Sequence, residues 1–485
     1  MLRLLLSLLT AAACCTAACT AACATAASQA APSRPNVVVI MTDDLGYGDL
    51  GCTGSRQVLS PNIDRLAETG VFCERAYAAA PMCAPSRMAL MTGRQPKRYG
   101  ITMNPNWKDP NLPESRYGLP TTERMLPDYL NPLGYCCGVV GKWHLGHTEG
   151  QRPQDRGFAR WWGFLGGSRS YLPMAKEQEG LNPSRIVSNY DPAPQVSYLT
   201  DDVTREALRF IREQGARKQP FFLFVAYNAP HWPLESLSAD REATKRHAAA
   251  QGAPVPAGDR LHYCAMIHAV DRGVGQIVEA LREQGVAADT LVFFMSDNGG
   301  APEAPASNAP WRGHKRLHYD GGVRVPFIVS CAAEKPGPAL PTDAFKPGSR
   351  CRKLVSLMDV LPTVLDLNDQ DAPDAMDGRS LLPALRGEPT AGRRLEWCTA
   401  ETNAILADGW KLLRAKGVPP RLYCLREDPT EQRDRSASEP EILRCLAREL
   451  DAYLNATPAP RYSDNPAWGQ KLLREHTEAK MMPQP

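Results

Sequence analysis

The feature that most constrains the fold is an alternation of short apolar runs with segments of helical periodicity. The apolar runs are continuous and short, as is typical of strands buried in a parallel sheet. They span residues 36–41, 135–140, 221–227 and 291–295. Helical patterns at 61–69, 200–214 and 265–284 lie between them. The order strand, helix, strand predicts an α/β fold in which helices cover both faces of one sheet.

Polar residues follow each of these apolar runs. In chain order they are Asp43 and Asp44, Lys142 and His144, Asn228 and His231, and Asp297 and Asn298. The carboxyl ends of parallel strands share one edge of a sheet, and ligands of open α/β folds bind there. The sequence therefore predicts that four strand ends converge on one polar site.

The sequence pattern of the chain changes between residues 372 and 392. Short runs at 397–399, 410–413 and 422–423 then indicate small antiparallel strands, and a helical pattern at 439–454 is expected to pack on them. The tail beyond Pro458 is polar and is expected to be loosely held. We place a domain boundary at about residue 388.

Residues 1–30 have the pattern of an export leader: a basic start, an apolar run and a stretch of small residues. Cleavage after 24–26, cleavage before Cys14 by a lipoprotein peptidase, and an uncleaved anchor all remain open, although the alanine-rich second half is weakly apolar for a span. We favour simple export, to the periplasm or outside the cell, with lipid anchoring as the alternative.

Composition excludes several other classes. With 43% apolar residues, 22% charged residues and a formal charge of +3, the chain is an ordinary globular protein with no indication of a nucleic-acid partner. Four of its fifteen cysteines lie in the leader, and the other eleven contain no CxxC pair of a zinc site. Cys136 and Cys137 are expected to be buried free thiols.

The segment Cys83-Ala84-Pro85-Ser86-Arg87 carries the strongest chemical signal. Pro85 suits the first turn of a helix, so the side chain of residue 83 is expected at a helix N-terminus, where free N–H groups favour an anion. Arg87 lies four positions further on, on the same face. Taken alone, the segment fits a structural cysteine before a helix equally well.

Together with further motifs in matching order, this segment resembles the sulfatase family and its Cys-x-Pro-Ser-Arg signature. The further motifs span 43–49, 141–146, 229–231, 296–299 and 315–326, and the resemblance runs from residue 34 to about 431. Lys97-Arg98 and the region around Gly141 are similar to the branch of arylsulfatase A and the N-acetylgalactosamine-6-sulfatases. Asp320 departs from the pattern, because Glu often precedes the Gly-Gly pair there.

The resemblance implies an alkaline-phosphatase-like fold, a large mixed sheet sandwiched by helices with a smaller C-terminal α+β subdomain that contains an antiparallel sheet. Residues 34–388 would form the catalytic domain, and residues 389–485 the C-terminal subdomain and tail.

The polar strand ends offer the ligands of a hard cation. Asp43, Asp44, Asp297 and Asn298 can offer only oxygen atoms as metal ligands, which suit a hard divalent ion and exclude a zinc-type site. The resemblance implies one calcium ion, with residue 83 as a further ligand.

The resemblance also implies that a formylglycine-generating enzyme oxidises Cys83 to formylglycine (3-oxoalanine). One hydroxyl of its hydrate would attack sulfur, and the other would allow sulfate to be expelled. His144 would be the base in that expulsion.

The remaining roles are implied by the same resemblance. His231 and Lys315 would lie at the leaving oxygen, and Arg87 and Lys142 would hold the formylglycine and the sulfate oxygens. Ser168 matches a sulfate-contacting serine. The substrate-binding set is thus Lys142, His231, Lys315 and Ser168.

Export and family together indicate sulfate monoesters of carbohydrates, with aryl sulfates also cleaved. An indole on a loop could stack on a sugar, although most of the candidates are expected to be core or loop anchors. The candidates are Trp107, Trp161, Trp162, Trp232 and Trp311. The alternatives are a phosphodiesterase or phosphonate hydrolase of the same superfamily, and a non-catalytic binder of sulfated glycans.

Overall fold

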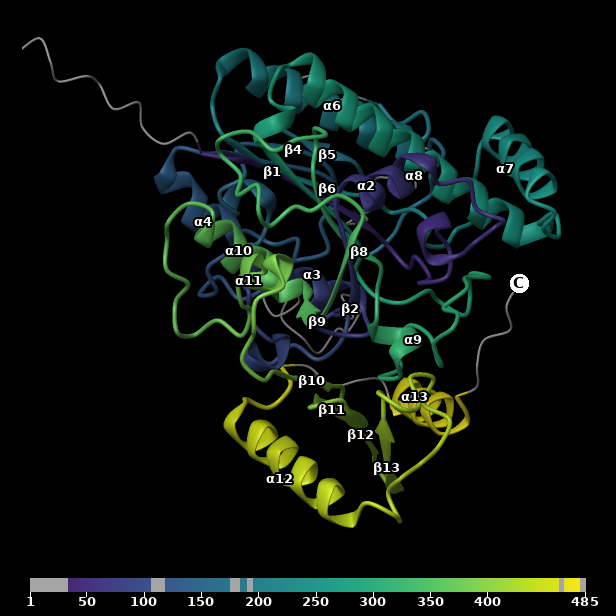
Figure 1. The fold of residues 1–485 in the computed structure, drawn as a ribbon. Helices are drawn as coiled ribbons and strands as arrows, with labels where there is room; N and C mark the ends of the chain where they lie inside the picture. The colour runs from purple at the N-terminus through teal and green to yellow at the C-terminus, as the bar shows by residue number, and fades with distance from the viewer. Residues whose placement is uncertain (1–33, 106–117, 175–183, 190–194, 462–465, 480–485) are drawn as a thin grey trace, which may run out of the picture. The chain divides into compact units, whose positions relative to one another are not determined.

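A large mixed sheet forms the centre of the molecule (Figure 1). Across the described residues, nine strands form this sheet in the order β5-β4-β3-β6-β1-β7-β8-β2-β9. They are β1 Asn36–Thr42, β2 Val71–Tyr77, β3 Cys136–Lys142, β4 Arg160–Phe164, β5 Val187–Ser188, β6 Phe221–Ala226, β7 Thr290–Ser296, β8 Phe327–Cys331 and β9 Ser349–Ser356.

The computed structural model from which this sheet is taken describes residues 34–105, 118–174, 184–189, 195–461 and 466–479. The predicted leader lies outside these residues. The described residues from Pro35 onward belong to one compact unit, and the boundary at about residue 388 stays a prediction.

The strands at the middle of the sheet are parallel. Met41 of β1 lies opposite Ala226 of β6 and Met295 of β7, and β3 pairs in parallel with β6 and β4. The four predicted strands are confirmed as β1, β3, β6 and β7. Antiparallel pairing enters at β8, which runs against both β7 and β2, so the sheet is mixed.

Helices cover both faces of the sheet. The side chains of a strand alternate between the two faces, so an all-apolar strand presents apolar groups to a helical layer on each side. Val38 and Ile40 of β1 pack with one helical layer, and Val37 and Val39 with the other. The first layer contains α2 Pro61–Thr69, α6 Leu199–Arg217 and α8 Gly258–Glu283, with α7 Ser238–Ala250 beside α8. The second contains α3 Cys83–Thr92, α4 Leu126–Leu130, α10 Val360–Asp366 and α11 Leu382–Arg386.

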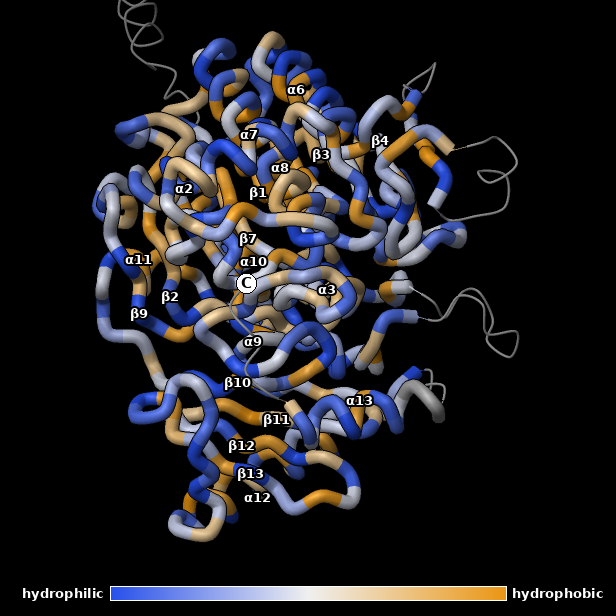
Figure 2. Tube along the Cα trace, turned by 90° about the vertical axis from the view of Figure 1, so that its right-hand side faces the viewer, coloured by the Kyte–Doolittle hydropathy of each residue, from blue (hydrophilic) through white to orange (hydrophobic). Residues whose placement is uncertain are grey.

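A separate antiparallel sheet follows. In the described chain it has four strands, β10 Arg394–Cys398, β11 Thr402–Ala407, β12 Trp410–Ala415 and β13 Val418–Cys424. Its strands are rich in hydrophobic residues (Figure 2), and the helix α12 Pro440–Ala456 packs Leu446 and Leu450 against Ile405 and Leu412. The predicted small sheet and its helix are therefore present, with β11 as an additional strand.

The expectation of a loosely held tail is wrong for residues 466–479. Pro466–Glu478 form the helix α13, in which Leu472 and His476 are buried. The periodic burial of these two side chains outweighs the polar composition, since one apolar stripe is enough to dock a helix.

A buried charge cluster joins the two sheets. Lys411 Nζ on β12 lies 2.9 Å from Asp320 Oδ1, on the short helix α9 Asp320–Val323, and 2.9 Å from Glu431 Oε1. Arg324 Nη1 lies 3.1 Å from Asp320 Oδ2, and Tyr77 donates to the same oxygen. We call these five residues the junction cluster. Its two cations balance its two carboxylates, as burial of charge requires.

Two further findings concern residues spread along the chain. No helix within the described ranges is long and apolar enough to cross a membrane. The eleven cysteines that the structure describes are free thiols, and Cys136 and Cys137 are buried as expected.

Candidate active site

Four neighbouring strands bring the predicted residues together. Because β3, β6, β1 and β7 are adjacent and parallel, their carboxyl ends lie along one edge of the sheet. β1 leads into Asp43 and Asp44, β7 into Asp297 and Asn298, and Lys142 ends β3. The predicted convergence of strand ends is confirmed in the geometry.

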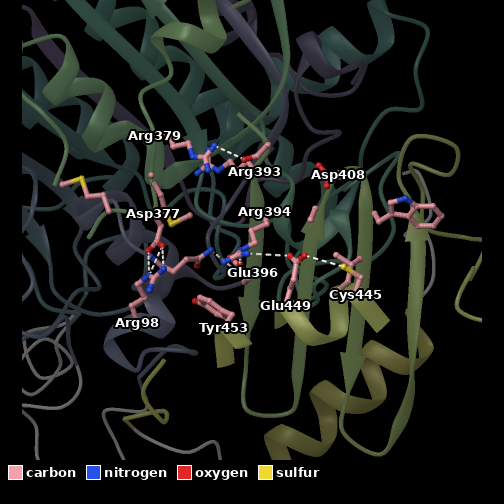
Figure 3. A pocket seen from close by; sticks show the side chains of 18 of the residues that line it. Arg98, Asp377, Arg379, Arg393, Arg394, Glu396, Asp408, Cys445, Glu449 and Tyr453 are labelled. Carbon is pink, nitrogen blue, oxygen red and sulfur yellow. Dashed lines mark hydrogen bonds and ion pairs between the residues drawn. The ribbon is translucent and has the colours of Figure 1, made fainter. Parts of the chain in front are cut away.

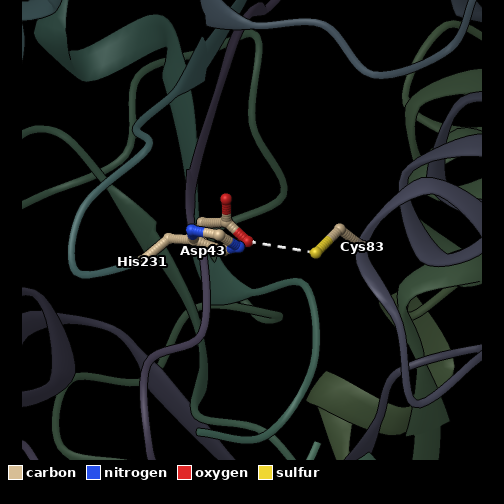
Figure 4. Close-up of side chains that lie close together, drawn as sticks. All are labelled: Asp43, Cys83 and His231. Atoms are coloured by element: carbon tan, nitrogen blue, oxygen red, sulfur yellow. Dashed lines mark hydrogen bonds between the residues drawn. The ribbon is translucent and has the colours of Figure 1, made fainter. Parts of the chain in front are cut away.

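Three carboxylates and the thiol of residue 83 form the centre of the site. Ligand atoms of Asp43, Asp44, Asp297 and Cys83 all lie within 4.8 Å of one another, so the group could hold a metal ion. Asp43 also lies beside Cys83 and His231 (Figure 4), and the Cys83 thiol is 3.3 Å from Asp43 Oδ1. All three carboxylates are buried.

The fifth candidate ligand points to the same centre. Asn298 Nδ2 donates to Asp44 Oδ1 at 2.7 Å, while Asn298 Oδ1 is buried without a hydrogen-bond partner. Rotation of the carboxamide by half a turn would present this oxygen instead of the NH₂ group. A cluster of three carboxylates with an unpartnered amide oxygen fits a hard divalent cation.

Buried cations surround the carboxylates. Arg87 lies 2.8 Å from Asp297 Oδ2 through Nη2 and donates through Nη1 to the Lys142 carbonyl at 3.1 Å. Lys142 Nζ pairs with Asp43 Oδ2, and Lys315 Nζ lies 2.7 Å from Asp44 Oδ1. These three cations balance the three carboxylates, so a divalent cation would leave the site with two positive charges in excess, which favours an anionic substrate.

The helix α3 fixes residue 83. It begins at Cys83, and the backbone N–H of Ala84 is held by Asn104 Oδ1 at 2.9 Å. Ser86 donates to the Ala80 carbonyl at 2.7 Å and so ties the first turn to the preceding loop. Burial and the nearby Asp43 carboxylate raise the pKa of the Cys83 thiol to about 12, so the unmodified thiol is a poor nucleophile at neutral pH.

Two histidines lie at the site. His144 Nδ1 is buried without a partner, and burial together with Lys142 and Arg87 keeps the pKa of His144 well below its usual range. His231 Nε2 lies 3.6 Å from Asp44 Oδ2 and its Nδ1 lies 2.5 Å from the Trp232 carbonyl. Burial lowers the pKa of His231 to about 4, despite the attraction of Asp44. Both imidazoles are therefore neutral at neutral pH.

The acidic groups differ in their electrostatic environment. Burial opposes ionisation of Asp44, but Lys315 and His231 outweigh it and lower its pKa. Burial and the neighbouring Asp43 raise the pKa of Asp297 to about 6, although Arg87 opposes that rise. Burial also disfavours the charge on Lys315, yet Asp44 raises its pKa, so it remains a cation.

Three of the seven non-glycine residues that the structure describes with positive φ lie at or beside the site. Asp44 and His144 have φ of 65° and 59°, and Arg316, which follows Lys315, has φ of 80°. Non-glycine residues seldom adopt this region, and such strain persists where the surroundings enforce it. Gly167 is required for a different reason: a Cβ there would lie 2.8 Å from the His144 ring.

Ser168, predicted to contact the sulfate group, has no described contact that places it among the candidate ligands. Its carbonyl accepts from Ser184 at 2.6 Å, and its side chain makes no described contact with the candidate ligands.

Two tyrosines that support the site were not predicted from the sequence. Tyr263 accepts from the Gly46 N–H and donates to the Asp44 carbonyl, both at 3.0 Å, and Tyr171 donates to the His231 carbonyl at 2.9 Å. No local pattern marks such long-range contacts.

A separate cavity of about 650 Å³ lies between the loop at Asp377, the small sheet and α12 (Figure 3). Its charged groups pair with each other: Arg98 lies 2.6 Å from Asp377, and Arg394 lies 2.9 Å from Glu396. None of the predicted site residues lines it. We therefore assign the chemistry to the strand ends.

Comparisons with known proteins agree with this geometry. A family model described as Sulfatase matches residues 35–369. The pig N-acetylgalactosamine-6-sulfatase is 34% identical over an alignment of 371 residues, and the match covers 73% of this chain and 66% of the relative. The chain therefore spans just under two thirds of that relative's length.

A solved structure is similar over most of both chains. The crystal structure of Ps i-CgsB in complex with k-i-k-neocarrahexaose is 32% identical, with a TM-score of 0.80, and the match covers 92% of this chain and 98% of that one. The mouse steryl-sulfatase is 30% identical over 77% of this chain and 69% of its own length. These matches confirm the predicted resemblance and the expected fold.

Proposed function

We propose that this chain, which belongs to the sulfatase family, hydrolyses sulfate monoesters of carbohydrates, with residue 83 as the nucleophile after oxidation of its thiol to formylglycine. The observation that carries the proposal is the position of Cys83. It lies at the start of α3, 3.3 Å from Asp43, inside a buried site of three carboxylates and three cations. The carbohydrate class is supported by the names of the pig relative and of the neocarrahexaose complex.

We assign the metal site to Asp43, Asp44, Asp297, Asn298 and residue 83, and calcium is the ion that suits their oxygen atoms. When bound, the ion would polarise a sulfate oxygen and the formylglycine would supply the attacking hydroxyl. The three buried cations of the chain offset the three carboxylates, so the charge of the ion would remain available to hold the anionic ester.

The cations can contact sulfate without leaving their carboxylates. Lys142 and Lys315 each carry three N–H donors and use only some of them for Asp43 and Asp44. Each can therefore donate to a sulfate oxygen or to the leaving oxygen. Arg87 holds Asp297 and the end of β3 in register, which fixes the position of both.

The histidines are suited to proton transfer. His144 is neutral, has an unpartnered Nδ1 and lies among Lys142, Arg87 and Lys315, so it can accept the proton of residue 83 when sulfate is expelled. His231 directs Nε2 toward Asp44, because the Trp232 carbonyl engages Nδ1. We place this nitrogen at the leaving oxygen.

Export and maturation belong to the same proposal. The leader pattern of residues 1–30 would take the protein to the periplasm or outside the cell, where sulfated carbohydrates occur, and a formylglycine-generating enzyme would act on Cys83 first. We also propose residues 34–388 as the catalytic domain and 389–485 as the C-terminal subdomain and tail.

The proposal is tested by comparing rates on an aryl sulfate, N-acetylgalactosamine 6-sulfate and an aryl phosphodiester, using protein coexpressed with a formylglycine-generating enzyme. We expect sulfate esters to be cleaved faster than the phosphodiester, and Cys83→Ala to abolish turnover while the fold is retained. Faster cleavage of the phosphodiester would favour a phosphodiesterase, and carbohydrate binding without turnover by the matured protein would favour a non-catalytic binder.

A further inference from the structure

One indole is exposed beside the site. Trp232 follows His231, and 60% of its surface is open to solvent. A large aromatic side chain normally buries most of its area, and exposed apolar groups that gather at a polar site often mark a binding surface. The other candidate indoles within the described residues, Trp161, Trp162 and Trp311, are buried. Trp107 lies outside those residues.

Trp232 is the chain neighbour of the site residue His231, which is partly open to solvent. The side chains of Asp43, Arg87 and Lys142 are fully buried, whereas 19% of the His231 side chain remains exposed. His231, like His144, is thus partly open to solvent, and we place the alcohol of the sulfate ester on the His231 side. The indole is attached to the next residue in the chain.

The backbone that carries the indole is held firmly. The His231 N–H donates to the Asn228 carbonyl at 2.9 Å, and the buried Tyr171 donates to the His231 carbonyl at 2.9 Å. Glu235 accepts from the Tyr171 N–H at 2.7 Å and thereby ties this loop to the segment before Leu172. A side chain on a fixed backbone can bind without a large loss of entropy.

A second exposed apolar side chain lies on the adjoining segment. Leu172 is 44% exposed and follows Tyr171. Tyr171 donates hydrogen bonds to the His231 carbonyl through its hydroxyl and to the Glu235 carboxylate through its backbone N–H. The exposed side chains of Trp232 and Leu172 thus lie on two segments that are joined by the hydrogen bond from the Tyr171 N–H to Glu235. The neighbouring site is lined mainly by charged groups. Water-exposed apolar surface at this place suits a ligand with an apolar face and a polar rim.

We propose that Trp232 is a stacking platform for the pyranose ring that carries the sulfate group, and that it gives the site its preference for carbohydrate esters. The C–H groups on one face of a pyranose match the flat indole, while the ring hydroxyls stay in water. This inference rests on the proposed function, and it goes further by naming the residue that recognises the sugar.

The test measures binding without turnover. In protein that carries Cys83→Ala, calorimetry compares N-acetylgalactosamine 6-sulfate, k-i-k-neocarrahexaose and inorganic sulfate. We expect Trp232→Ala to weaken binding of at least one saccharide about tenfold and Trp232→Phe to recover most of that loss, while the affinity for inorganic sulfate stays within about twofold. Val255→Ala is the matched control, because Val255 is 50% exposed on another loop, and it should change nothing.

The outcomes separate this inference from the proposed function. Unchanged saccharide binding in Trp232→Ala, or equal weakening of saccharide and inorganic sulfate, would overturn the stacking role, and so would a parent protein that binds neither saccharide. If the saccharides bind through Trp232 but the matured protein does not hydrolyse them, the proposed reaction fails and the stacking role stands.

Discussion

Lys411→Met perturbs the junction cluster most directly. The substitution keeps an unbranched apolar chain but removes the ammonium group that lies 2.9 Å from both Asp320 and Glu431. Arg324 then remains paired with Asp320, and the buried Glu431 carboxylate loses the cation that lies beside it, so one negative charge is uncompensated. Removing one partner of a buried ion pair costs about 3–5 kcal/mol, and we expect a loss of stability of that order.

The loss should depend on pH with a definite sign. Burial, together with Asp320 and despite Lys411, raises the pKa of Glu431 from its usual 4.5 to about 7. The folded protein thus binds the carboxyl proton of Glu431 more tightly than the unfolded chain does. The stability contributed by the protonated carboxyl is therefore present at acidic pH and is lost as pH rises through about 7. Without Lys411 the ionised carboxylate is still less favourable. The destabilisation should therefore be larger at about pH 8 than at about pH 5.

Urea denaturation followed by circular dichroism at both pH values measures the effect. Lys411→Met/Glu431→Gln should recover part of the stability, because it restores the charge balance of the cluster. Lys416→Met is the matched control: its side chain is 76% exposed, and we expect a change within about 0.5 kcal/mol. A loss below about 1 kcal/mol in Lys411→Met, or one that does not vary with pH, would refute the reasoning.

The remaining predictions concern the proposed active site. Asp297→Ala removes a central carboxylate and leaves Arg87 with only the more distant Asp43 carboxylate, 4.0 Å away, so calcium binding by calorimetry and turnover should both fall, the latter by at least about 100-fold; turnover near that of the parent would exclude Asp297 as a ligand. His144→Ala should release about one equivalent of alcohol per enzyme in rapid-mixing experiments and then stop, because expulsion of sulfate lacks its base; the absence of any burst would count against that role. Gly167→Ala places a methyl group 2.8 Å from the His144 ring, so we expect kcat to fall at least about tenfold with an unchanged unfolding midpoint; normal kcat would show that the ring tolerates displacement.

The residues that line the site could be found from the sequence because each follows a recognisable local signal. Asp43, Lys142 and Asp297 come directly after, or at the end of, apolar strands. Because these strands are parallel, their carboxyl ends lie at one edge of the sheet and the three side chains meet there. Cys83 and Arg87 are one helical turn apart, a spacing that fixes their common face without knowledge of the fold.

Other features could not be predicted because their causes lie far away in the chain. Lys411 and Asp320 are separated by 91 positions, and neither has a local pattern that marks its partner. The helix α13 packs His476 beside Tyr319, with ring centroids 5.1 Å apart, and this contact exists only in the folded protein. The exposure of Trp232, in contrast with the buried Trp311, likewise follows from tertiary packing alone.

The central claim is that residue 83 acts as formylglycine, and the intact mass of the peptide that contains it tests this claim most directly. In active protein coexpressed with a formylglycine-generating enzyme, we expect that peptide to be about 18 Da lighter than the unmodified sequence requires, the change from thiol to aldehyde. Full activity toward an aryl sulfate in protein whose residue 83 is entirely an unmodified thiol would contradict the mechanism.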